Sequence, residues 1–349
     1  MKSLDIRYLS RLQFSADQAA SLKRIGESKG RQDLFFRQTP EVLKTLRQTA
    51  IIESSESSNR LEGIVAPHGR VEALVNHSTN PRNRPEQEIA GYRDALNLVH
   101  ESAQNMPFTE NVILQLHAYI HRYLPANGGQ WKKIDNSIVE KNLDGTVRRI
   151  RFKPVNAMAT PDAMAALAHN YKEVLDVHHQ EPLVVVPAAI LDFLCIHPFS
   201  DGNGRTARLL TLLLLYHFDY QVGRYISLER LFEESKESYY ETLEISSQGW
   251  HEGKHDIMPW MTYFWGVMIK AYREFEERVG NIRTGRGSKT DQIRQAVARR
   301  MGPFAISDIE NECQGISRDM VRVVLRQLKE DGVISPDGKG RSAKWVKKG

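Results

Sequence analysis

Two apolar runs of this 349-residue chain meet at a short polar stretch, HPFSDGNGRTAR, which extends from His197 to Arg208. The run before it is LVVVPAAILDFLCI, and the run after it is LLTLLLLYHF. Both are shorter than the roughly 20 apolar residues that a membrane span needs, and the first contains Pro187 and Asp192. We therefore predict two buried core helices joined by a polar turn.

Most of the remaining sequence has the periodicity of α-helices, with apolar residues at helical spacing and charged residues between them. The clearest segments are TPEVLKTLRQTAIIESSES, EIAGYRDALNLVHES, TENVILQLHAYIHRYL and PDAMAALAHNYKEVLDVHH. Thr109 and Thr160 stand just before two of these runs and are expected to cap them. The predicted fold class is mainly α, a helical bundle.

One segment, KKIDNSIVEKNLDGTVRRIRFKP, departs from this pattern. It has two stretches enriched in β-branched residues around Asp144-Gly145, and an Asp-Gly pair in that setting is a strong signal for a hairpin turn. The sequence therefore predicts a small β-hairpin set into a helical body.

The last part of the chain is expected to form a separate module. Asn281 to Lys289 is polar and contains glycine, which predicts a linker, and residues 290–349 predict three helices followed by two short strands. This order resembles that of the winged helix-turn-helix family. From Lys289 onward there are 13 Lys and Arg against 8 Asp and Glu, so the entire net charge of +5 lies here, which suggests an acidic partner.

Basic residues of this module are candidates for contact with DNA. They are Arg318, Arg322 and Arg326 on the third helix, which Ser317 is expected to cap, and Lys339, Arg341 and Lys344 in the wing. The alternative is that the arginines form a solvated helix face and that the wing contacts protein.

Cysteine usage and the amino-terminal residues indicate the compartment. Cys195 and Cys313 lie far apart without the spacing of metal ligands, which fits a reducing environment. MKSLDIRYLS lacks the apolar core of a signal peptide. The sequence therefore predicts a cytoplasmic protein.

The polar stretch has the composition of an anion site. Gly202 and Gly204 let the backbone turn tightly and approach a ligand, and the helix that starts here directs free N–H groups and a positive dipole end toward it. Arg205 and Arg208 are three residues apart, so they share a helix face and suit successive phosphates.

Two other residues of the stretch point to chemistry. Asp201 is a hard oxygen ligand suited to Mg²⁺, and His197 is a natural general base at neutral pH. The phosphate loop GxxxxGK[ST] is absent, and the stretch contains no lysine. A helix cap with surface arginines and a core histidine is the alternative for any one residue, but not for the set.

The stretch matches the signature HPFx[DE]GNGRxxR of the Fic family at every specified position, and the chain resembles this family over roughly residues 40 to 280. The resemblance implies an AMP transferase that uses ATP as co-substrate. His197 would deprotonate a Tyr, Thr or Ser hydroxyl of a protein target, and that oxygen would attack the α-phosphate and expel pyrophosphate. The asparagine and the second arginine disfavour the Fic relatives that phosphorylate or transfer phosphocholine.

The same resemblance assigns further roles. Asp201 would hold Mg²⁺ or Mn²⁺ on the α- and β-phosphates, Asn203 would contact the α-phosphate, and Phe199 would tuck under the loop. Arg205 would contact the β-phosphate and Arg208 the γ-phosphate. The implied nucleotide-binding residues are Gly202, Asn203, Gly204, Arg205, Arg208, Tyr239 and Tyr240, with the two tyrosines at the adenine. The hairpin, from Asp135 to Phe152, would be a flap that holds the target segment by strand addition.

A second motif lies upstream, in SSNRLEGI from Ser57 to Ile64. Ser58, Glu62 and Gly63 match the family's inhibitory pattern [ST]xxxE[GN], which implies the class with an amino-terminal inhibitory helix, here about residues 50–63. A carboxylate beside Arg208 would compete with the γ-phosphate, and Gly63 would end the helix. An ordinary helix end with a solvated Glu62 is the alternative.

The sequence therefore predicts an autoinhibited protein adenylyltransferase that also modifies itself. The expected domains are a helical region over residues 1–100, a catalytic core over 101–280, a linker over 281–289 and a winged helix over 290–349. Expected partners are ATP, a protein target, DNA and a second copy of the chain. The alternatives are a DNA-binding regulator with a nucleotide-sensing core, and an enzyme that removes AMP at the same site with Glu62 positioning the water.

Overall fold

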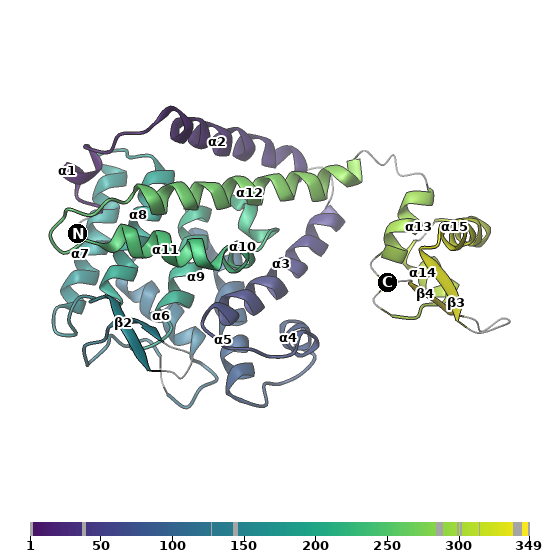
Figure 1. Ribbon diagram of the computed structural model, residues 1–349, viewed down its shortest axis with the longest axis horizontal. Helices are drawn as coiled ribbons and strands as arrows, with labels where there is room; N and C mark the ends of the chain where they lie inside the picture. The colour runs from purple at the N-terminus through teal and green to yellow at the C-terminus, as the bar shows by residue number, and fades with distance from the viewer. Residues whose placement is uncertain are drawn as a thin grey trace. The chain divides into compact units, whose positions relative to one another are not determined.

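The computed structural model describes residues 3–36, 40–126, 128–141, 146–283, 289–298, 300, 302–313, 315–337 and 344–347. The chain divides into two compact units, Met1–Phe275 and Glu276–Gly349. Figure 1 shows that the first unit is built from helices and one small hairpin, as the sequence predicts.

The first unit contains most of the helices. Before the hairpin they are α1 (Ile6–Leu9), α2 (Ala16–Phe36), α3 (Pro40–Leu61), α4 (His68–Val75), α5 (Arg84–Ser102) and α6 (Glu110–Ile120). The hairpin is formed by β1 (Ile138–Lys141) and β2 (Val147–Phe152). After it come α7 (Thr160–Asp176), α8 (Pro182–Ile196), α9 (Asn203–His217), α10 (Leu228–Glu234), α11 (Lys236–Ser247) and α12 (Met258–Arg283).

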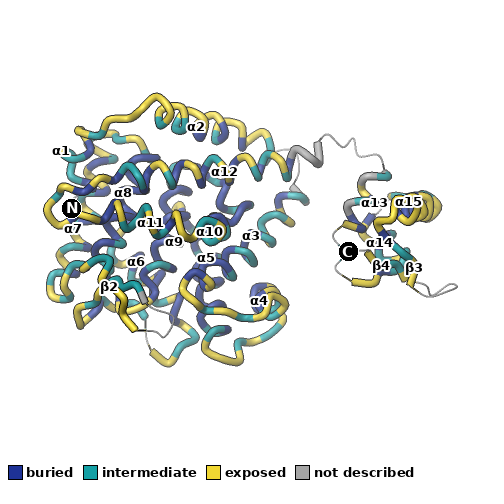
Figure 2. Tube along the Cα trace, viewed as in Figure 1, coloured by how far each residue is buried: buried dark blue, intermediate teal, exposed yellow. Residues whose placement is uncertain are grey.

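Helices α8 and α9 form the centre of this unit, which confirms the prediction of two core helices. Figure 2 shows both as largely buried, with α3, α5, α7 and α12 around them. Leucines from Leu209 to Leu215 are at most 1% exposed. Fully burying a leucine contributes about 1.5–3 kcal/mol, so this apolar helix is a rigid support for whatever lies at its amino terminus.

Pro187 lies inside α8 without leaving an unpaired carbonyl. Proline has no N–H to donate to the residue four positions earlier, which here is Leu183. The indole Nε1 of Trp265 donates to the Leu183 carbonyl at 2.8 Å, and Trp260 Nε1 donates to the Pro187 carbonyl at 2.9 Å. Helix α12 therefore supplies the hydrogen bonds that let α8 continue through a proline.

Asp192, the acidic residue of the first apolar run, is fully buried in α8. Its carboxylate accepts from the backbone N–H of Ser3 at 3.2 Å and of Leu4 at 3.3 Å, and from Trp250 Nε1 at 2.6 Å. Burial is the main cause that raises the pKa of Asp192. These contacts fasten the first described residues of the chain to α8, one helical turn before the polar turn.

The predicted hairpin is present, with β1 and β2 paired antiparallel and Val139 opposite Ile150. The Asp144-Gly145 pair predicted to form its turn lies outside the described residues.

One of the two predicted helix caps is correct. Thr109 accepts from the Val112 N–H and caps α6. Thr160 is instead the first residue of α7, and its hydroxyl donates to the Asn156 carbonyl at 2.8 Å, so the prediction that it caps the helix is wrong. The side-chain oxygen of Asn156, which accepts from the Ala159 N–H at 2.8 Å, organises this turn in its place.

The second unit has three helices followed by two strands. They are α13 (Lys289–Ala298), α14 (Ile306–Glu312), α15 (Arg318–Glu330), β3 (Ile334–Asp337) and β4 (Lys344–Lys347). Phe304 forms an isolated bridge with Trp345, and Ser317 accepts from the Met320 N–H to cap α15 as expected. Helix α12 continues to Arg283, so it extends into the segment predicted to be a linker.

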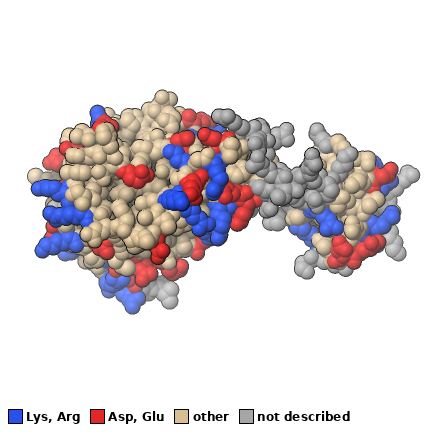
Figure 3. Space-filling view, turned by 90° about the horizontal axis from the view of Figure 1, so that it is seen from above, with Lys and Arg blue, Asp and Glu red and all other residues tan. Residues whose placement is uncertain are grey.

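Charges of both signs are interspersed on the surface. Figure 3, which views the molecule from above, shows basic and acidic side chains lying side by side on the first unit. Ion pairs such as Arg230 with Glu274 at 2.7 Å and Lys270 with Glu234 at 2.7 Å join α10 to α12. Among the helices that the structure describes, none combines the length and apolarity needed to cross a bilayer.

Candidate active site

The turn between α8 and α9 contains two left-handed backbone positions. His197 follows the end of α8 with φ 51°, and Gly202 precedes α9 with φ 79°. The left-handed conformation costs a non-glycine residue about 1–2 kcal/mol, so the surroundings must hold His197 there. At Gly202 an added Cβ would lie 3.0 Å from the His121 ring, so both space and conformation require glycine.

Asn203 closes this turn through its side chain. Its Oδ1 accepts from the Phe199 N–H at 2.9 Å, and its Nδ2 donates to the Phe199 carbonyl at 2.7 Å. The Asn203 side chain is thus engaged within the loop, while its backbone N–H lies in the first turn of α9, where helix amides lack intrahelical acceptors. Phe199 is fully buried beneath the loop, as expected.

His117 of α6, a residue that no sequence motif singled out, supports the loop. Its ring stacks on Phe199 at 3.7 Å between centroids. Nδ1 accepts from the Gly129 N–H at 2.8 Å, so the proton lies on Nε2, which donates to the Asp201 carbonyl at 3.0 Å. Burial is the main cause that lowers the pKa of His117 to about 4. The histidine pair one helical turn apart in LHAYIH was the available signal.

His197 has the protonation state that a general base needs. Its pKa is lowered to about 4: burial is the largest cause and the Lys132 ammonium adds to it, while the Leu194 carbonyl and the Glu62 and Asp201 carboxylates oppose it. The imidazole is therefore neutral at physiological pH and able to accept a proton.

Asp201 is the acidic residue of the loop, and its side chain is 63% exposed. Within the described ranges, no three His, Cys, Asp or Glu side chains are grouped so that they could hold a metal ion by themselves. Mg²⁺ commonly takes one or two carboxylates and completes its coordination with substrate phosphates and water. A single exposed carboxylate beside an anion site fits that donor set.

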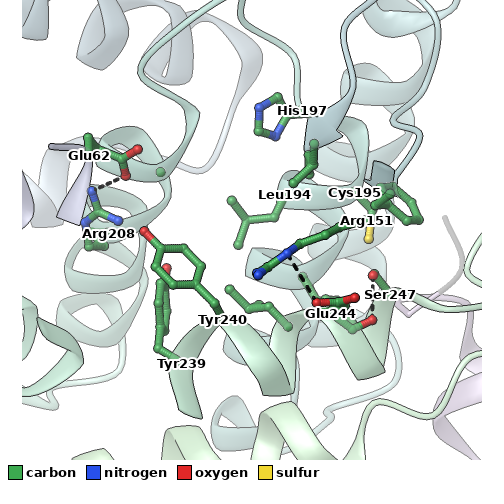
Figure 4. Close-up of a pocket in the computed structure, with 15 residues that line it drawn as sticks. Glu62, Arg151, Leu194, Cys195, His197, Arg208, Tyr239, Tyr240, Glu244 and Ser247 are labelled. Carbon is green, nitrogen blue, oxygen red and sulfur yellow. Dashed lines mark hydrogen bonds and ion pairs between the residues drawn. The ribbon is translucent and has the colours of Figure 1, made fainter. Parts of the chain in front are cut away.

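Arg208 is buried, and Figure 4 shows it in contact with Glu62, which follows the end of α3. Its Nε donates to Ser58 Oγ at 2.8 Å, and its Nη2 donates to the Ser58 carbonyl at 2.8 Å and to Glu62 Oε1 at 2.7 Å. Burial lowers the pKa of Arg208, but the Glu62 carboxylate and nearby tyrosines raise it more, so the guanidinium stays charged.

Glu62 is brought to this position by the way α3 ends. Gly63 has φ 80°, its N–H donates to the Arg60 carbonyl at 3.0 Å, and the Ile64 N–H donates to the Asn59 carbonyl at 2.9 Å. These two bonds form a Schellman motif, which a left-handed glycine permits. The chain therefore turns immediately after Glu62.

The Glu62 carboxylate lies against the amino terminus of α9. A Cβ added to Gly204 would be 2.2 Å from Glu62 Oε1 and 3.1 Å from Arg208 Nη1. A helix amino terminus favours anions through its free N–H groups and its dipole. The inhibitory-pattern carboxylate therefore occupies the anion position that the sequence predicts for a phosphate.

Arg205 is buried and has other partners than Arg208. Its side chain is 1% exposed, its Nη1 donates to Glu88 Oε2 of α5 at 2.7 Å, and its Nη2 lies 3.6 Å from Asp201 Oδ2. The prediction that the two arginines bind successive phosphates stays untested; in this structure Glu88 already occupies the guanidinium of Arg205. Pairing with Glu88 draws the first guanidinium into the core.

A cavity of about 210 Å³ opens beside these groups. Figure 4 shows Glu62 and Arg208 at one end, His197 at its edge, and Tyr239 and Tyr240 along one side. Tyr240 donates to the Leu61 carbonyl at 3.1 Å, and Tyr239 is 3% exposed. The remaining lining residues, from the hairpin, α8, α9 and α11, are Ile138, Arg151, Phe152, Leu191, Leu194, Cys195, Gly204, Leu243, Glu244 and Ser247.

The hairpin is fastened to α11 across the cavity. Arg151 lies 3.5 Å from Glu244, and Arg149 also forms an ion pair with Glu244. Glu140 on the opposite strand pairs with Arg149 at 2.8 Å. The helical spacing from Tyr240 through Glu244 was a signal that these residues share one face, but it did not indicate that the hairpin arginines meet them.

In the second unit, the predicted DNA-contact residues lie on the exposed face of α15. Arg318, Arg322 and Arg326 are all exposed. Arg318 forms an ion pair with Glu310 at 3.3 Å, and Arg322 forms one with Asp319 at 3.4 Å. Lys344 is exposed on β4, whereas Lys339 and Arg341 of the predicted wing lie outside the described residues.

The family comparison agrees with the geometry. Residues 107–215, which include the hairpin, α8 and most of α9, match the model of the Fic/DOC family. Over 181 residues the chain is 26% identical to the Protein adenylyltransferase Fic of Drosophila ananassae. The aligned region covers 50% of this chain and 31% of that protein. Over 91 residues it is 26% identical to a Fido domain-containing protein of Dictyostelium discoideum, covering 26% of this chain and 59% of that one.

Solved structures show the same fold. A Fic family protein from Desulfovibrio desulfuricans G20 has a TM-score of 0.63 at 20% identity and covers 97% of this chain and 98% of its own. A Fic domain containing signaling protein from Bacteroides thetaiotaomicron VPI-5482 has a TM-score of 0.62 at 22% identity and covers 74% and 97%. The chain thus has a mainly helical fold similar to that of Fic proteins, its residues 107–215 match the Fic/DOC family model, and it spans under a third of the Drosophila relative.

Proposed function

We propose that this chain is a protein adenylyltransferase that transfers AMP from ATP to a Tyr, Thr or Ser hydroxyl of a protein, itself included, and that Glu62 restrains this activity. The observation that carries the proposal is the contact of the Glu62 carboxylate with Arg208, 2.7 Å apart, at the amino terminus of α9. A carboxylate held in an anion site competes directly with a phosphate for the same guanidinium. Glu62 therefore restrains the step for which the Fic signature is built.

The chemistry follows from the residues around the turn. The amides at the start of α9 and the Arg208 guanidinium bind the triphosphate once Glu62 leaves. The target hydroxyl oxygen attacks the α-phosphorus as neutral His197 accepts its proton, and the bond between the α-phosphorus and the bridging oxygen breaks. AMP becomes attached to the target oxygen, and pyrophosphate leaves with the electron pair of the broken bond.

Asp201 is the residue that would hold Mg²⁺ together with phosphate oxygens. When bound, the cation neutralises charge on the phosphates and on the leaving pyrophosphate. Arg205 is not among the residues that line the cavity, so we assign it to orienting the loop through Glu88 and Asp201. Direct contact of Arg205 with a β-phosphate requires its guanidinium to leave Glu88.

The cavity supports a nucleotide-shaped ligand. Its apolar side chains from α8 and α11 lie beyond Tyr240, at the end opposite Arg208, and suit a purine ring. The hairpin residues Ile138, Arg151 and Phe152 line the same cavity. A target segment added to the hairpin edge would be held beside the transferred phosphate, which is the role we propose for residues 135–152.

A second candidate is removal of AMP from a modified target at the same site. Glu62 is one-third exposed and lies in the same cavity as His197, so its carboxylate has access to a water molecule. Incubating a pre-modified substrate with the unaltered chain and with Glu62→Gln tests this activity. Release of AMP that requires Glu62 would assign the removal reaction.

The deciding experiment is mass spectrometry of the full chain after incubation with ATP and Mg²⁺. Adenylyl transfer predicts the added mass of AMP, more of it in Glu62→Gly than in the unaltered chain, and none in His197→Ala. Equal labelling of the unaltered chain and Glu62→Gly would reject the restraint by Glu62. An absence of label in every variant would reject self-modification.

For the second unit we propose a winged helix whose third helix, α15, contacts DNA. The support is the exposed row of Arg318, Arg322 and Arg326, although two of the three are paired with carboxylates. DNA retention by the full chain should fall steeply with salt and should weaken in Arg326→Ala. A cytoplasmic location and formation of a homodimer stay predictions from the sequence.

A further inference from the structure

Lys132 carries a buried ammonium whose hydrogen-bond partners are neutral. The residue is 3% exposed, and its Nζ donates to the Ile196 carbonyl at 3.1 Å and to Asn136 Oδ1 at 2.9 Å. Across the described part of the chain, no carboxylate lies within ion-pair distance of it. Lysine is rarely buried without a paired charge, because desolvating the ammonium is costly. The position therefore calls for a functional reason.

The partners of Lys132 are all tied to the turn that carries His197. Its backbone N–H donates to the Pro198 carbonyl at 2.8 Å, and its Nζ holds the carbonyl of Ile196. Asn136, which the ammonium holds in turn, donates from Nδ2 to the Phe199 carbonyl at 3.0 Å. The carbonyls of Ile196, Pro198 and Phe199 are thus all bound by residues of one segment, from Lys132 to Asn136.

This arrangement explains how His197 keeps a left-handed conformation. The last carbonyls of a helix have no donor within the helix, and a cation there also complements the helix dipole. Lys132 supplies both a hydrogen-bond donor and a positive charge at the end of α8. The same segment continues directly into β1, so the flap strand and the turn with His197 share one anchor.

We propose that Lys132 is a positioning residue for His197, which it holds in place through the Ile196 and Pro198 carbonyls and, by way of Asn136, the Phe199 carbonyl. The inference rests on the proposed adenylyl transfer, for which His197 is the base. It adds a residue outside the HPFSDGNGRTAR stretch to the machinery of that step.

The charge of Lys132 has a second effect on His197. Four groups act on the imidazole through their charges or dipoles. Lys132 lowers its pKa, and the Leu194 carbonyl and the Glu62 and Asp201 carboxylates raise it. Lys132 alone of these lowers the pKa of His197, because a nearby cation disfavours the imidazolium. Removing that charge raises the pKa, so the loss of activity at low pH should begin at higher pH.

The test uses the full chain with Glu62→Gly as the parent, so that the site is unrestrained. Three variants are compared in that background: Lys132→Met removes the ammonium, Lys132→Arg keeps a cation, and Lys133→Met is the matched control at an exposed neighbour. The measurements are kcat and KM for ATP from labelled AMP incorporation, each over a range of pH.

For Lys132→Met we expect kcat to fall about tenfold or more, with KM for ATP within about threefold, because the base is misplaced while the phosphate contacts remain. Its acid limb should move up by about half a pH unit or more. Lys132→Arg should keep the acid limb of the parent, and Lys133→Met should match the parent throughout. An unchanged kcat, or a lower kcat with an unmoved acid limb, would overturn the proposal.

If Lys132→Met does not fold, Lys132→Arg decides, because an acid limb displaced despite the retained charge would contradict the inference. If the parent transfers no AMP, the proposed function fails, but the inference is still measurable. NMR titration of His197 in Lys132→Gln, with Glu62 intact, should then show a raised pKa, and an unchanged one would reject the role of Lys132.

Discussion

Replacement of Glu62 by glutamine is the most direct perturbation of the restraint, because it keeps the shape of the side chain and removes only its charge. The carboxylate lies 2.7 Å from a guanidinium that is 2% exposed, while Glu62 itself is 33% exposed. Hydrogen bonds to charged groups contribute about 1.5–3 kcal/mol, and partial exposure places this one near the lower end, about 1.5–2 kcal/mol.

The energy of the contact between Glu62 and Arg208 determines the expected change in the rate of AMP incorporation. ATP must displace the Glu62 carboxylate before its phosphates reach Arg208, so the energy of that contact adds to the barrier for productive binding. Each 1.4 kcal/mol corresponds to a tenfold change, so Glu62→Gln should raise the initial rate of AMP incorporation about 10- to 30-fold at ATP concentrations below KM. Labelled ATP and the full chain provide the assay, and His197→Ala provides the background.

Glu56→Gln is the matched control. Glu56 lies on α3, shortly before Glu62; its side chain is 16% exposed, and it pairs with Arg60 and with His68, outside the lining of the cavity. It should therefore incorporate AMP at the rate of the unaltered chain. A rate for Glu62→Gln that stays within twofold of Glu56→Gln would refute the argument that this contact is what limits nucleotide binding.

Three further predictions concern the same region. Gly204→Ala should destabilise the chain more when Glu62 is present than in Glu62→Gly, because the new Cβ would lie 2.2 Å from Glu62 Oε1; a double-mutant cycle of urea unfolding measures this coupling. Gly63→Ala should cost about 1 kcal/mol in urea unfolding, since its φ is 80° with open space around it, and no loss of stability would contradict the strain argument. Because burial lowers the pKa of His117 from 6.5 to about 4, the unfolded chain binds protons first, so the free energy of unfolding should fall as the pH drops from 6.5 to 4. That fall should be smaller in His117→Asn, and an identical slope would exclude His117 as a source.

Local patterns predicted the parts of the fold that depend on neighbouring residues. The two apolar runs became α8 and α9, the Asp-Gly segment became a hairpin, and Gly63 ends α3 with a left-handed residue. Periodicity, glycine conformation and capping are properties of a few consecutive residues. Thr160 was misjudged because it is the first residue of α7, and its hydroxyl donates to the Asn156 carbonyl instead of accepting from a helix N–H.

The residues of the site that belong to a sequence motif could be predicted. The contacts that depend on tertiary packing could not. Glu62 and Arg208 come together as the two motifs indicated. The sequence alone did not reveal the pairing of Arg205 with Glu88 or the stacking of His117 under Phe199. These partners lie far apart along the chain, and only the packing of α5, α6 and α9 brings them together.

The sequence by itself therefore determined the chemical groups: a histidine, an aspartate, a glycine-rich helix start and an arginine opposed by a carboxylate. The tertiary structure decided their states. Burial keeps His197 neutral, Glu88 pairs with Arg205 in the core, and Lys132 holds the turn from outside the motif. The physical reason is that a residue's chemistry is local, whereas its solvation, its charge neighbours and its direction depend on which distant segments pack against it.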